Sequence, residues 1–425
     1  MIPTLDPESL AAFEVALEDG RLALRPEPRL PADARCYLER HLERLNHFKT
    51  VGFFRGARSV SFFDPPLPSG PGKRGLIDRL ERVFLKARKP AAATLAVTYA
   101  CQADCVHCSC QPNIRRWPPL STEQWKGIIR ETVDLGTTNV IFTGGEPLLR
   151  PDIFELTACV DKERATCLMF TNGERLTPDA CTRLRDAGLY ALFISLDSPD
   201  EKIHDERRRR PGLYQAIMRN IENAKRAGLM VGFSIYLTGE KFRDGELAGF
   251  MDLGKKLGIN EIVQFDAIPT GRLAGQKDIL LTPEEREAIR KEALRYYRDP
   301  AYPSLTAQAL VNSPDSMGCF GAYNQFYMTA YGDMCPCDFT PIAFGNAVEE
   351  GVRAVWERMT HHPLWCKRHK DCRMQNQKFR SCTVDLIPPG AQLPYPIAAI
   401  EAAAQGAVVT DLARNSPVGA KQARS

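Results

Sequence analysis

The sequence predicts an α/β protein built around a parallel sheet of six strands. Six short apolar runs rich in β-branched residues recur along the middle of the chain, and a helical periodicity separates each run from the next. This alternation is typical of right-handed βαβ units that cover a parallel sheet with helices. The runs are TLAVTYA, TNVIFTG, ATCLMFTN, YALFISLD, MVGFSIYLT and NEIVQFDAI. Six such units favour a partial (β/α)6 barrel of the TIM type.

The remaining sequence divides around this barrel. Two helical patterns, near Pro7–Leu17 and Ala32–Leu45, precede a segment rich in proline and glycine, so we expect a small, mostly helical N-terminal region. That region could cover one end of the barrel or bind a partner. The predicted units are an N-terminal region over 1–90, the barrel over 91–300, a cysteine-rich extension over 301–387 and a mobile tail over 388–425.

Composition and charge exclude several functions. The chain has 425 residues, of which 44% are hydrophobic and 25% charged, as in ordinary globular proteins. A net charge of +4 is too small for this length to predict a nucleic-acid partner or a membrane surface. The start lacks a signal-peptide pattern, and no run reaches the roughly 18 apolar residues of a spanning helix. We therefore expect a soluble, cytoplasmic protein, and we interpret Arg207–Arg210 as the solvated end of a loop.

The fourteen cysteines are concentrated in two groups. Four lie between Cys101 and Cys110, and six lie between Cys319 and Cys382. In a reducing compartment, grouped cysteines are more often metal ligands than disulfides. The sequence therefore predicts two metal-binding regions.

The first group supplies three thiols, Cys101, Cys105 and Cys108, directly after the first predicted strand. Thiolates hold iron–sulfur clusters, and a cubane needs four ligands to close all its irons. Three thiolates leave one iron open, as catalytic zinc sites keep one open position. The spacing by itself also fits a zinc site.

Polar or glycine-rich motifs follow the next three strands. They are Gly144-Gly145-Glu146-Pro147, Thr171-Asn172-Gly173 and Ser195-Leu196-Asp197-Ser198. The carboxyl ends of barrel strands open on one face, so these motifs and the three cysteines are expected at one mouth. Paired glycines let the backbone approach a ligand closely. Each motif taken singly could equally be a helix cap or entry turn.

The C-x3-C-x2-C spacing, the GGEP motif and the order of the motifs resemble the radical S-adenosylmethionine (SAM) superfamily, over about Ala92 to Arg272. The resemblance implies that SAM chelates the open iron and that one electron yields a 5′-deoxyadenosyl radical, which abstracts a substrate hydrogen. It also implies that His107 lies near the adenine. Implied contacts to the amino group, ribose and carboxylate of SAM are Gly144, Gly145, Glu146, Pro147, Thr171, Asn172, Ser195 and Asp197.

The extension resembles the SPASM or shorter twitch domains of that superfamily, which carry auxiliary [4Fe–4S] clusters. Cys319 and Cys337 flank a predicted hairpin with its turn at Gly332-Asp333. The implied ligands of one auxiliary cluster are Cys319, Cys337, Cys372 and either Cys366 or Cys382. A second, partly ligated cluster and a zinc site are the alternatives. Pro269, Gly271 and Arg272 resemble the turn that leads into such extensions.

The resemblance implies a radical SAM enzyme with a small-molecule, lipid or peptide substrate and a reductant such as flavodoxin or ferredoxin. The sequence does not select the substrate. Two alternatives belong to other classes: a non-catalytic iron–sulfur electron carrier or scaffold, and a zinc-binding interaction protein.

Overall fold

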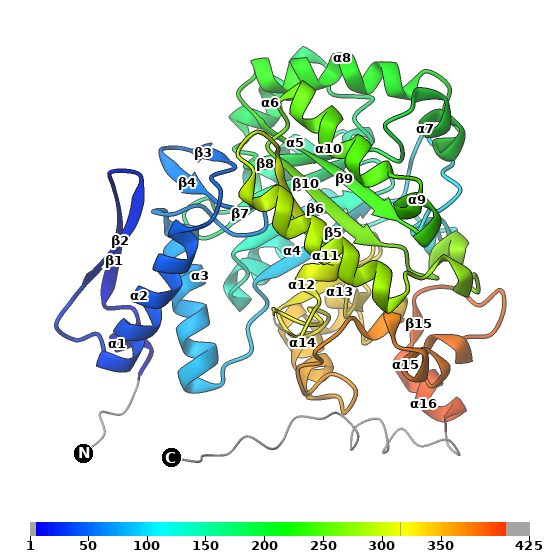
Figure 1. Ribbon diagram of the computed structural model, residues 1–425. Helices are drawn as coiled ribbons and strands as arrows, with labels where there is room; N and C mark the ends of the chain where they lie inside the picture. Colours follow the sequence, from blue (N-terminus) through cyan, green and yellow to red (C-terminus); the bar gives the residue numbers. More distant parts are fainter. Residues whose placement is uncertain (1–5, 315, 405–425) are drawn as a thin grey trace.

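A computed structural model describes residues 6–314 and 316–404 and shows a mixed sheet of nine strands (Figure 1). The sheet order is β11-β10-β9-β8-β7-β6-β5-β12-β13, and every neighbouring pair except β12 and β13 is parallel. The six predicted strands form its centre in chain order, which confirms the predicted parallel sheet. They are β5 (Ala92–Thr98), β6 (Asn139–Gly144), β7 (Thr166–Thr171), β8 (Ala191–Ser195), β9 (Met230–Leu237) and β10 (Glu261–Asp266).

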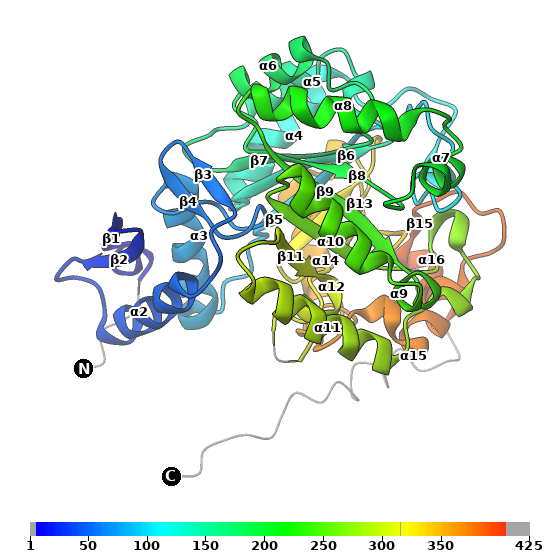
Figure 2. The same cartoon turned by 45° about the horizontal axis from the view of Figure 1, so that its top comes forward.

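Helices cover the outer face of this sheet (Figures 1 and 2). The five predicted helices are α4 (Thr122–Leu135), α5 (Ile153–Cys159), α6 (Pro178–Asp186), α8 (Leu213–Arg226) and α10 (Glu246–Leu257). The capping box between Ser121 and Gln124 begins α4, and Gly136 ends it at a positive φ of 121°. Three further helices are α7 (Glu201–Arg208), α9 (Gly239–Arg243) and α11 (Pro283–Arg298).

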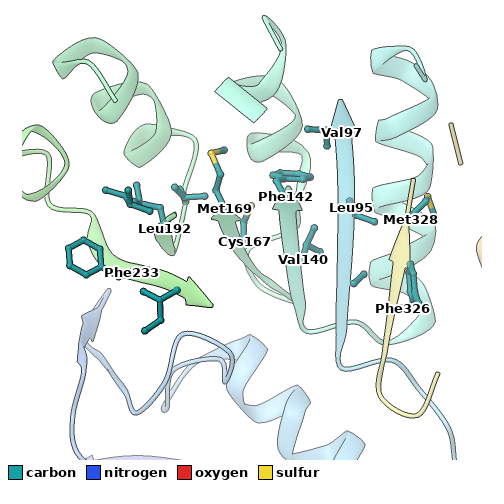
Figure 3. Packing of buried hydrophobic residues seen from close by; sticks show 14 of the residues in the cluster. Leu95, Val97, Val140, Phe142, Cys167, Met169, Leu192, Phe233, Phe326 and Met328 are labelled. Carbon is teal, nitrogen blue, oxygen red and sulfur yellow. The ribbon is translucent and has the colours of Figure 1, made fainter. Parts of the chain in front are cut away.

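Alternate residues of each strand supply two separate cores. Outward-facing side chains such as Leu95, Val140 and Phe233 pack against the helices (Figure 3). Inward-facing side chains such as Leu168 and Phe193 form a second apolar cluster inside the barrel. Both faces of the sheet are therefore buried, which explains why the strands read as continuous apolar runs.

The N-terminal region contains more helix than strand, but the predicted helix near Pro7–Leu17 is wrong over most of its length. The elements of this region are α1 (Pro7–Leu10), β1 (Phe13–Glu18), β2 (Arg21–Pro26), α2 (Ala32–Asn46), β3 (Gly52–Phe54), β4 (Ala57–Ser59), α3 (Gly70–Leu80) and the π-helical turn η1 (Glu81–Leu85). The predicted helix ends at Leu10, because the segment FEVALE forms the strand β1 and pairs antiparallel with β2. Asp19 and Gly20 both have positive φ, as a two-residue hairpin turn requires.

A segment of this region covers the end of the barrel where the strands begin. Phe62 packs against Tyr190 and Phe193, and its amide donates a 2.6 Å hydrogen bond to Glu261, the first residue of β10. Both views place β1, β2 and α2 on the far side of the barrel from α15 and α16 (Figures 1 and 2). The N-terminal region thus covers the barrel end opposite the predicted mouth.

The sheet continues past residue 300. Its further elements are β11 (Ser304–Ala307), α12 (Gln308–Val311), β12 (Gln325–Met328) and β13 (Met334–Cys335), followed by β14 (Ile342–Ala343), α13 (Ala347–Glu350), α14 (Val352–His361) and α15 (Gln377–Ser381). The predicted hairpin is confirmed, since β12 and β13 pair antiparallel around Gly332. The division into functional units at residue 300 stays a prediction.

The tail prediction is wrong for its first part. β15 (Tyr395–Pro396) pairs with β14, and α16 (Ile397–Ala403) buries Ile397 and Ile400 against the large outer core. Residues 405–425 of the predicted tail lie outside the described residues. Among the helices of the described part of the chain, none has the length and apolar character needed to cross a membrane.

Candidate active site

The three predicted cluster cysteines lie in one loop at the carboxyl end of β5. Cys101 is exposed, Cys108 is half-buried and Cys105 is buried. The loop is held from outside by α7, because the amide of Val106 donates to the carbonyl of Arg207 over 2.9 Å. This backbone hydrogen bond holds the loop without engaging a cysteine thiol.

The turn at Gly271 and Arg272 braces the same loop. Arg272 donates from Nη1 to the carbonyls of Asp104 and Cys105, each over 2.9 Å, and from its amide to the carbonyl of Cys108 over 3.0 Å. A Cβ on Gly271 would lie 2.4 Å from the Cα of Ser109, so only glycine permits this approach. The motif therefore supports the cysteine loop as well as leading into the extension.

Gly144 and Gly145 bring the GGEP loop against the end of β5. A Cβ on Gly144 would lie 2.0 Å from the carbonyl oxygen of Thr98, and one on Gly145 would lie 2.4 Å from that of Ala100. The amides of Gly145 and Glu146 donate to these two carbonyls over 2.8 Å each. The paired glycines thus set the position of the backbone that enters Cys101.

The Glu146 carboxylate is engaged within the protein. It is fully buried and accepts hydrogen bonds from the Thr171 hydroxyl at 2.8 Å, the Asn172 amide at 2.7 Å and the Leu148 amide at 3.0 Å. Burial raises the pKa of Glu146, and the hydrogen bonds from Asn172, Leu148 and Thr171 oppose that shift. The Glu146 carboxylate thus links the GGEP motif to the motif Thr171-Asn172-Gly173. Pro147 begins a short 3-10 turn directly after Glu146.

Asn172 offers a donor to the mouth of the barrel. Its side-chain oxygen accepts from Gln102 and from the Glu174 amide, but within residues 6–314 and 316–404 its buried Nδ2 has no hydrogen-bond partner. An unpaired buried donor is costly, so this group suits a ligand that carries acceptor oxygens. Ser195, at the end of the neighbouring strand β8, is half-buried.

The Asp197 carboxylate contacts Arg208 and faces His107. Arg208 contacts its carboxylate through Nε at 2.6 Å and Nη2 at 2.8 Å, and His107 Nε2 lies 3.6 Å away. Burial would raise the pKa of Asp197, but the charge of Arg208 holds it below the usual range. Arg208 is therefore the main partner of the Asp197 carboxylate.

Arg208 is a site residue that the sequence interpretation missed. It is buried in the last turn of α7, and its Nη1 lies 3.7 Å from the sulfur of Cys105. Arg207 also pairs with Glu246, so reading Arg207–Arg210 as a solvated loop end is wrong for its first two residues. The run of arginines was the one sequence signal for this site residue. Only the tertiary structure shows which of the four arginines are buried.

His107 packs against Tyr236. Its ring lies 4.3 Å from that of Tyr236, between centroids, at an angle of 32°. Burial lowers the pKa of His107 to about 4, so the imidazole is neutral at pH 7. Its Nδ1 is buried without a partner among the described residues.

In the extension, the structure gathers Cys319, Cys337 and Cys372. The amide of Cys319 donates to the carbonyl of His369 over 2.9 Å, and His369 lies three residues before Cys372 in the chain. Burial, together with the nearby thiols of Cys319 and Cys337, raises the pKa of Cys372. Cys366 is exposed, with its thiol 3.5 Å from the carbonyl of Pro363, and Cys382 is half-buried at the end of α15.

No group of three potential ligands among the described residues is arranged to hold a single metal ion. A cubane cluster spreads its thiolates over several irons, whereas a zinc ion binds all of its thiolates at one atom. Cys335 and Cys110 belong to the two cysteine groups but were not predicted as cluster ligands. Cys335 is buried in β13, and the Cys110 thiol donates to the carbonyl of Gly144 over 3.2 Å.

Comparison with known proteins agrees with this geometry. Residues 95–254 match the model of the radical SAM superfamily, and residues 319–383 match that of the SPASM iron-sulfur cluster-binding domain. The chain belongs to the radical SAM superfamily. It is a radical SAM enzyme, and its cofactors are a [4Fe–4S] cluster with SAM and auxiliary iron–sulfur clusters in the SPASM domain.

Several relatives are similar to this radical SAM enzyme. The AdoMet-dependent heme synthase of Nitratidesulfovibrio vulgaris is 28% identical over 318 residues, which cover 65% of this chain and 84% of the relative. The mycofactocin maturase MftC of Mycobacterium tuberculosis is 34% identical over 164 residues, which cover 38% of this chain and 41% of the relative.

Solved structures share the fold. SuiB of Streptococcus suis, bound to S-adenosylmethionine, aligns with a TM-score of 0.53 and 14% identity over 81% of this chain and 87% of that one. The protein anSMEcpe with bound AdoMet aligns with a TM-score of 0.53 and 15% identity over 77% of this chain and 100% of that one. Other structures of these two proteins hold peptides.

Proposed function

We propose that Cys101, Cys105 and Cys108 hold the SAM-binding [4Fe–4S] cluster of this radical SAM enzyme. When bound, the cluster and SAM together supply an electron and a 5′-deoxyadenosyl radical, which removes a hydrogen atom from the substrate. The observation that carries this proposal is the convergence of three thiols from one loop, the free Nδ2 of Asn172 and the guanidinium of Arg208 at the carboxyl ends of the strands.

Different side chains of the protein are proposed to contact different parts of SAM. Arg208 sets a positive charge beside Cys105, where an anionic carboxylate is favoured. Asn172 and Ser195 offer donors for hydroxyl or carboxylate oxygens, and His107 offers a neutral ring face to the adenine. Glu146 and Asp197 act by holding Thr171, Asn172 and Arg208 in place, so their contribution is indirect.

For the SPASM domain we propose that Cys319, Cys337, Cys372 and either Cys366 or Cys382 hold one auxiliary cluster, which accepts an electron from the substrate or binds it. Cys337 begins the loop that carries Phe339, and the ring of Phe339 lies 5.7 Å from that of Phe265 at the end of β10. This contact supports a SPASM loop that caps the barrel mouth and excludes water from the radical.

The substrate is proposed to be a small molecule, lipid or peptide with an apolar portion, because half-buried aromatic rings face the barrel interior. The rings of Phe170 and Phe265 pack with their centroids 6.3 Å apart and border the inner apolar cluster. The names of the relatives, an AdoMet-dependent heme synthase and a mycofactocin maturase, favour an organic substrate. We propose a cytoplasmic location and a flavodoxin or ferredoxin as reductant.

The proposal is tested with anaerobically reconstituted protein, dithionite and SAM. Wild-type protein and Cys36→Ala, which removes a thiol of α2 far from the site, are expected to form 5′-deoxyadenosine, and Cys105→Ala to form none. Visible absorbance without 5′-deoxyadenosine would identify an electron carrier or scaffold. Colourless protein that contains zinc would identify a zinc-binding interaction protein.

A further inference from the structure

Lys241 is a buried lysine next to the proposed SAM site. It lies in α9, and its side chain is 4% exposed. Its Nζ donates to the carbonyl of Asp197 over 2.9 Å, lies 3.5 Å from the carboxylate of Glu246 and sits 3.7 Å from the centroid of the Tyr236 ring. A lysine is rarely buried this fully unless its charge has a defined partner.

The contacts of Lys241 lead directly to the cysteine loop. One face of the Tyr236 ring receives the ammonium of Lys241, and the same ring packs against His107 at 4.3 Å. His107 lies between Cys105 and Cys108 in the chain. Lys241 also fixes the backbone of Asp197, whose carboxylate faces His107. Lys241 is therefore connected to the ring of His107 through Tyr236 and through Asp197.

The charges of this network do not cancel. Arg207, Arg208 and Lys241 are cations, whereas Asp197 and Glu246 are the two carboxylates that they contact. Three cations facing two carboxylates leave one positive charge in excess beside Cys105. This excess of positive charge among the five side chains favours anionic groups at the mouth.

We propose that Lys241 is a positioning residue for SAM. Its ammonium holds the end of β8 and the Tyr236 ring so that the His107 ring face is fixed, and it supplies the positive charge that an anionic carboxylate neutralises. The inference rests on the proposed function, because it places SAM at this mouth. Lys241 acts through Asp197, Tyr236 and His107 and touches no reacting atom.

The test compares Lys241→Met, which keeps the length of the side chain without its charge, with Lys241→Arg. Lys256→Met, on the exposed face of α10, is the matched control. The reconstituted variants are assayed for iron content, for binding of radiolabelled SAM and for the change in the electron paramagnetic resonance spectrum of the reduced cluster on adding SAM. We expect Lys241→Met to keep its iron and to bind SAM about tenfold more weakly, the scale of one lost charged contact.

Lys241→Arg is expected to recover most of the affinity, and Lys256→Met to equal wild type. If Lys241→Met fails to fold, Tyr236→Leu removes the ring between Lys241 and His107 and should weaken SAM binding in the same way. Wild-type affinity in Lys241→Met or Tyr236→Leu would overturn the inference, as would loss of iron in step with loss of SAM. Failure of the wild-type protein itself to bind SAM would instead overturn the proposed function.

Discussion

Asp197, just beyond β8, and Arg208, in the last turn of α7, form a buried bidentate ion pair with contacts of 2.6 and 2.8 Å. The pair ties two successive elements of the barrel together and leaves the third nitrogen of the guanidinium 3.7 Å from the sulfur of Cys105. The pair of Asp197 and Arg208 thus stabilises the barrel mouth and also places a guanidinium beside the cysteine loop.

Arg208→Met should be strongly destabilising. The substitution leaves Asp197 charged, buried and unpaired, a change that costs about 3–5 kcal/mol in other proteins. Chemical denaturation at pH 7 measures the free energy of unfolding. Arg209→Met is the control, because the Arg209 side chain forms an exposed pair with Asp104 whose loss should cost less than about 1 kcal/mol. Equal losses in the two variants would show that the buried pair contributes nothing specific.

Glu261 should make stability depend on pH. Burial raises the pKa of Glu261 from 4.5 to about 7, so the folded protein holds a proton that the unfolded chain has already released. The free energy of unfolding therefore falls as pH rises from about 4.5 to about 7, by up to a few kcal/mol, and this contribution is flat above that range. Glu261→Gln should lose this part of the slope in denaturation curves between pH 5 and 8. An unchanged slope would contradict the assignment.

Gly144→Ala should disturb the cysteine loop. The added Cβ would lie 2.0 Å from the carbonyl oxygen of Thr98, and the φ of 138° is strained for alanine. Iron content after reconstitution and the melting temperature are both expected to fall. Gly127→Ala is the control, since a Cβ there meets nothing within 4 Å and alanine favours helix α4 by roughly 0.5–1 kcal/mol. A Gly144→Ala protein with full iron and wild-type melting would refute this role of the glycine.

The auxiliary ligands can be identified by iron analysis. Alanine at Cys319, Cys337 or Cys372 should lower the iron content by about four atoms per chain, because these three thiols lie together. One of Cys366→Ala and Cys382→Ala should show the same loss. Cys335→Ala is the control, since Cys335 is buried in β13 against Tyr327. Iron loss in Cys335→Ala with none in Cys337→Ala would require a different set of ligands.

Short-range patterns predicted much of the fold. The six central strands and the five helices between them have the positions that apolar runs and helical periodicity indicate, because each is decided by residues close in sequence. The N-terminal helix near Pro7–Leu17 failed where local signals compete: the segment contains helix formers, but the turn at Asp19 and Gly20 lets β1 pair with β2. The strand β11 and the pairing of β12 with β5 were missed, because both depend on partners from a distant part of the chain.

The sequence by itself determined the class of chemistry, since the spacing of Cys101, Cys105 and Cys108 and the paired glycines are properties of single loops. Only the tertiary structure decided which charged residues serve that chemistry. Arg208 and Arg209 are neighbours with the same side chain, yet one is buried beside Cys105 and the other is exposed. Burial and pairing arise when distant elements pack together, so neither the engaged carboxylate of Glu146 nor the ammonium of Lys241 could be assigned before the fold was known.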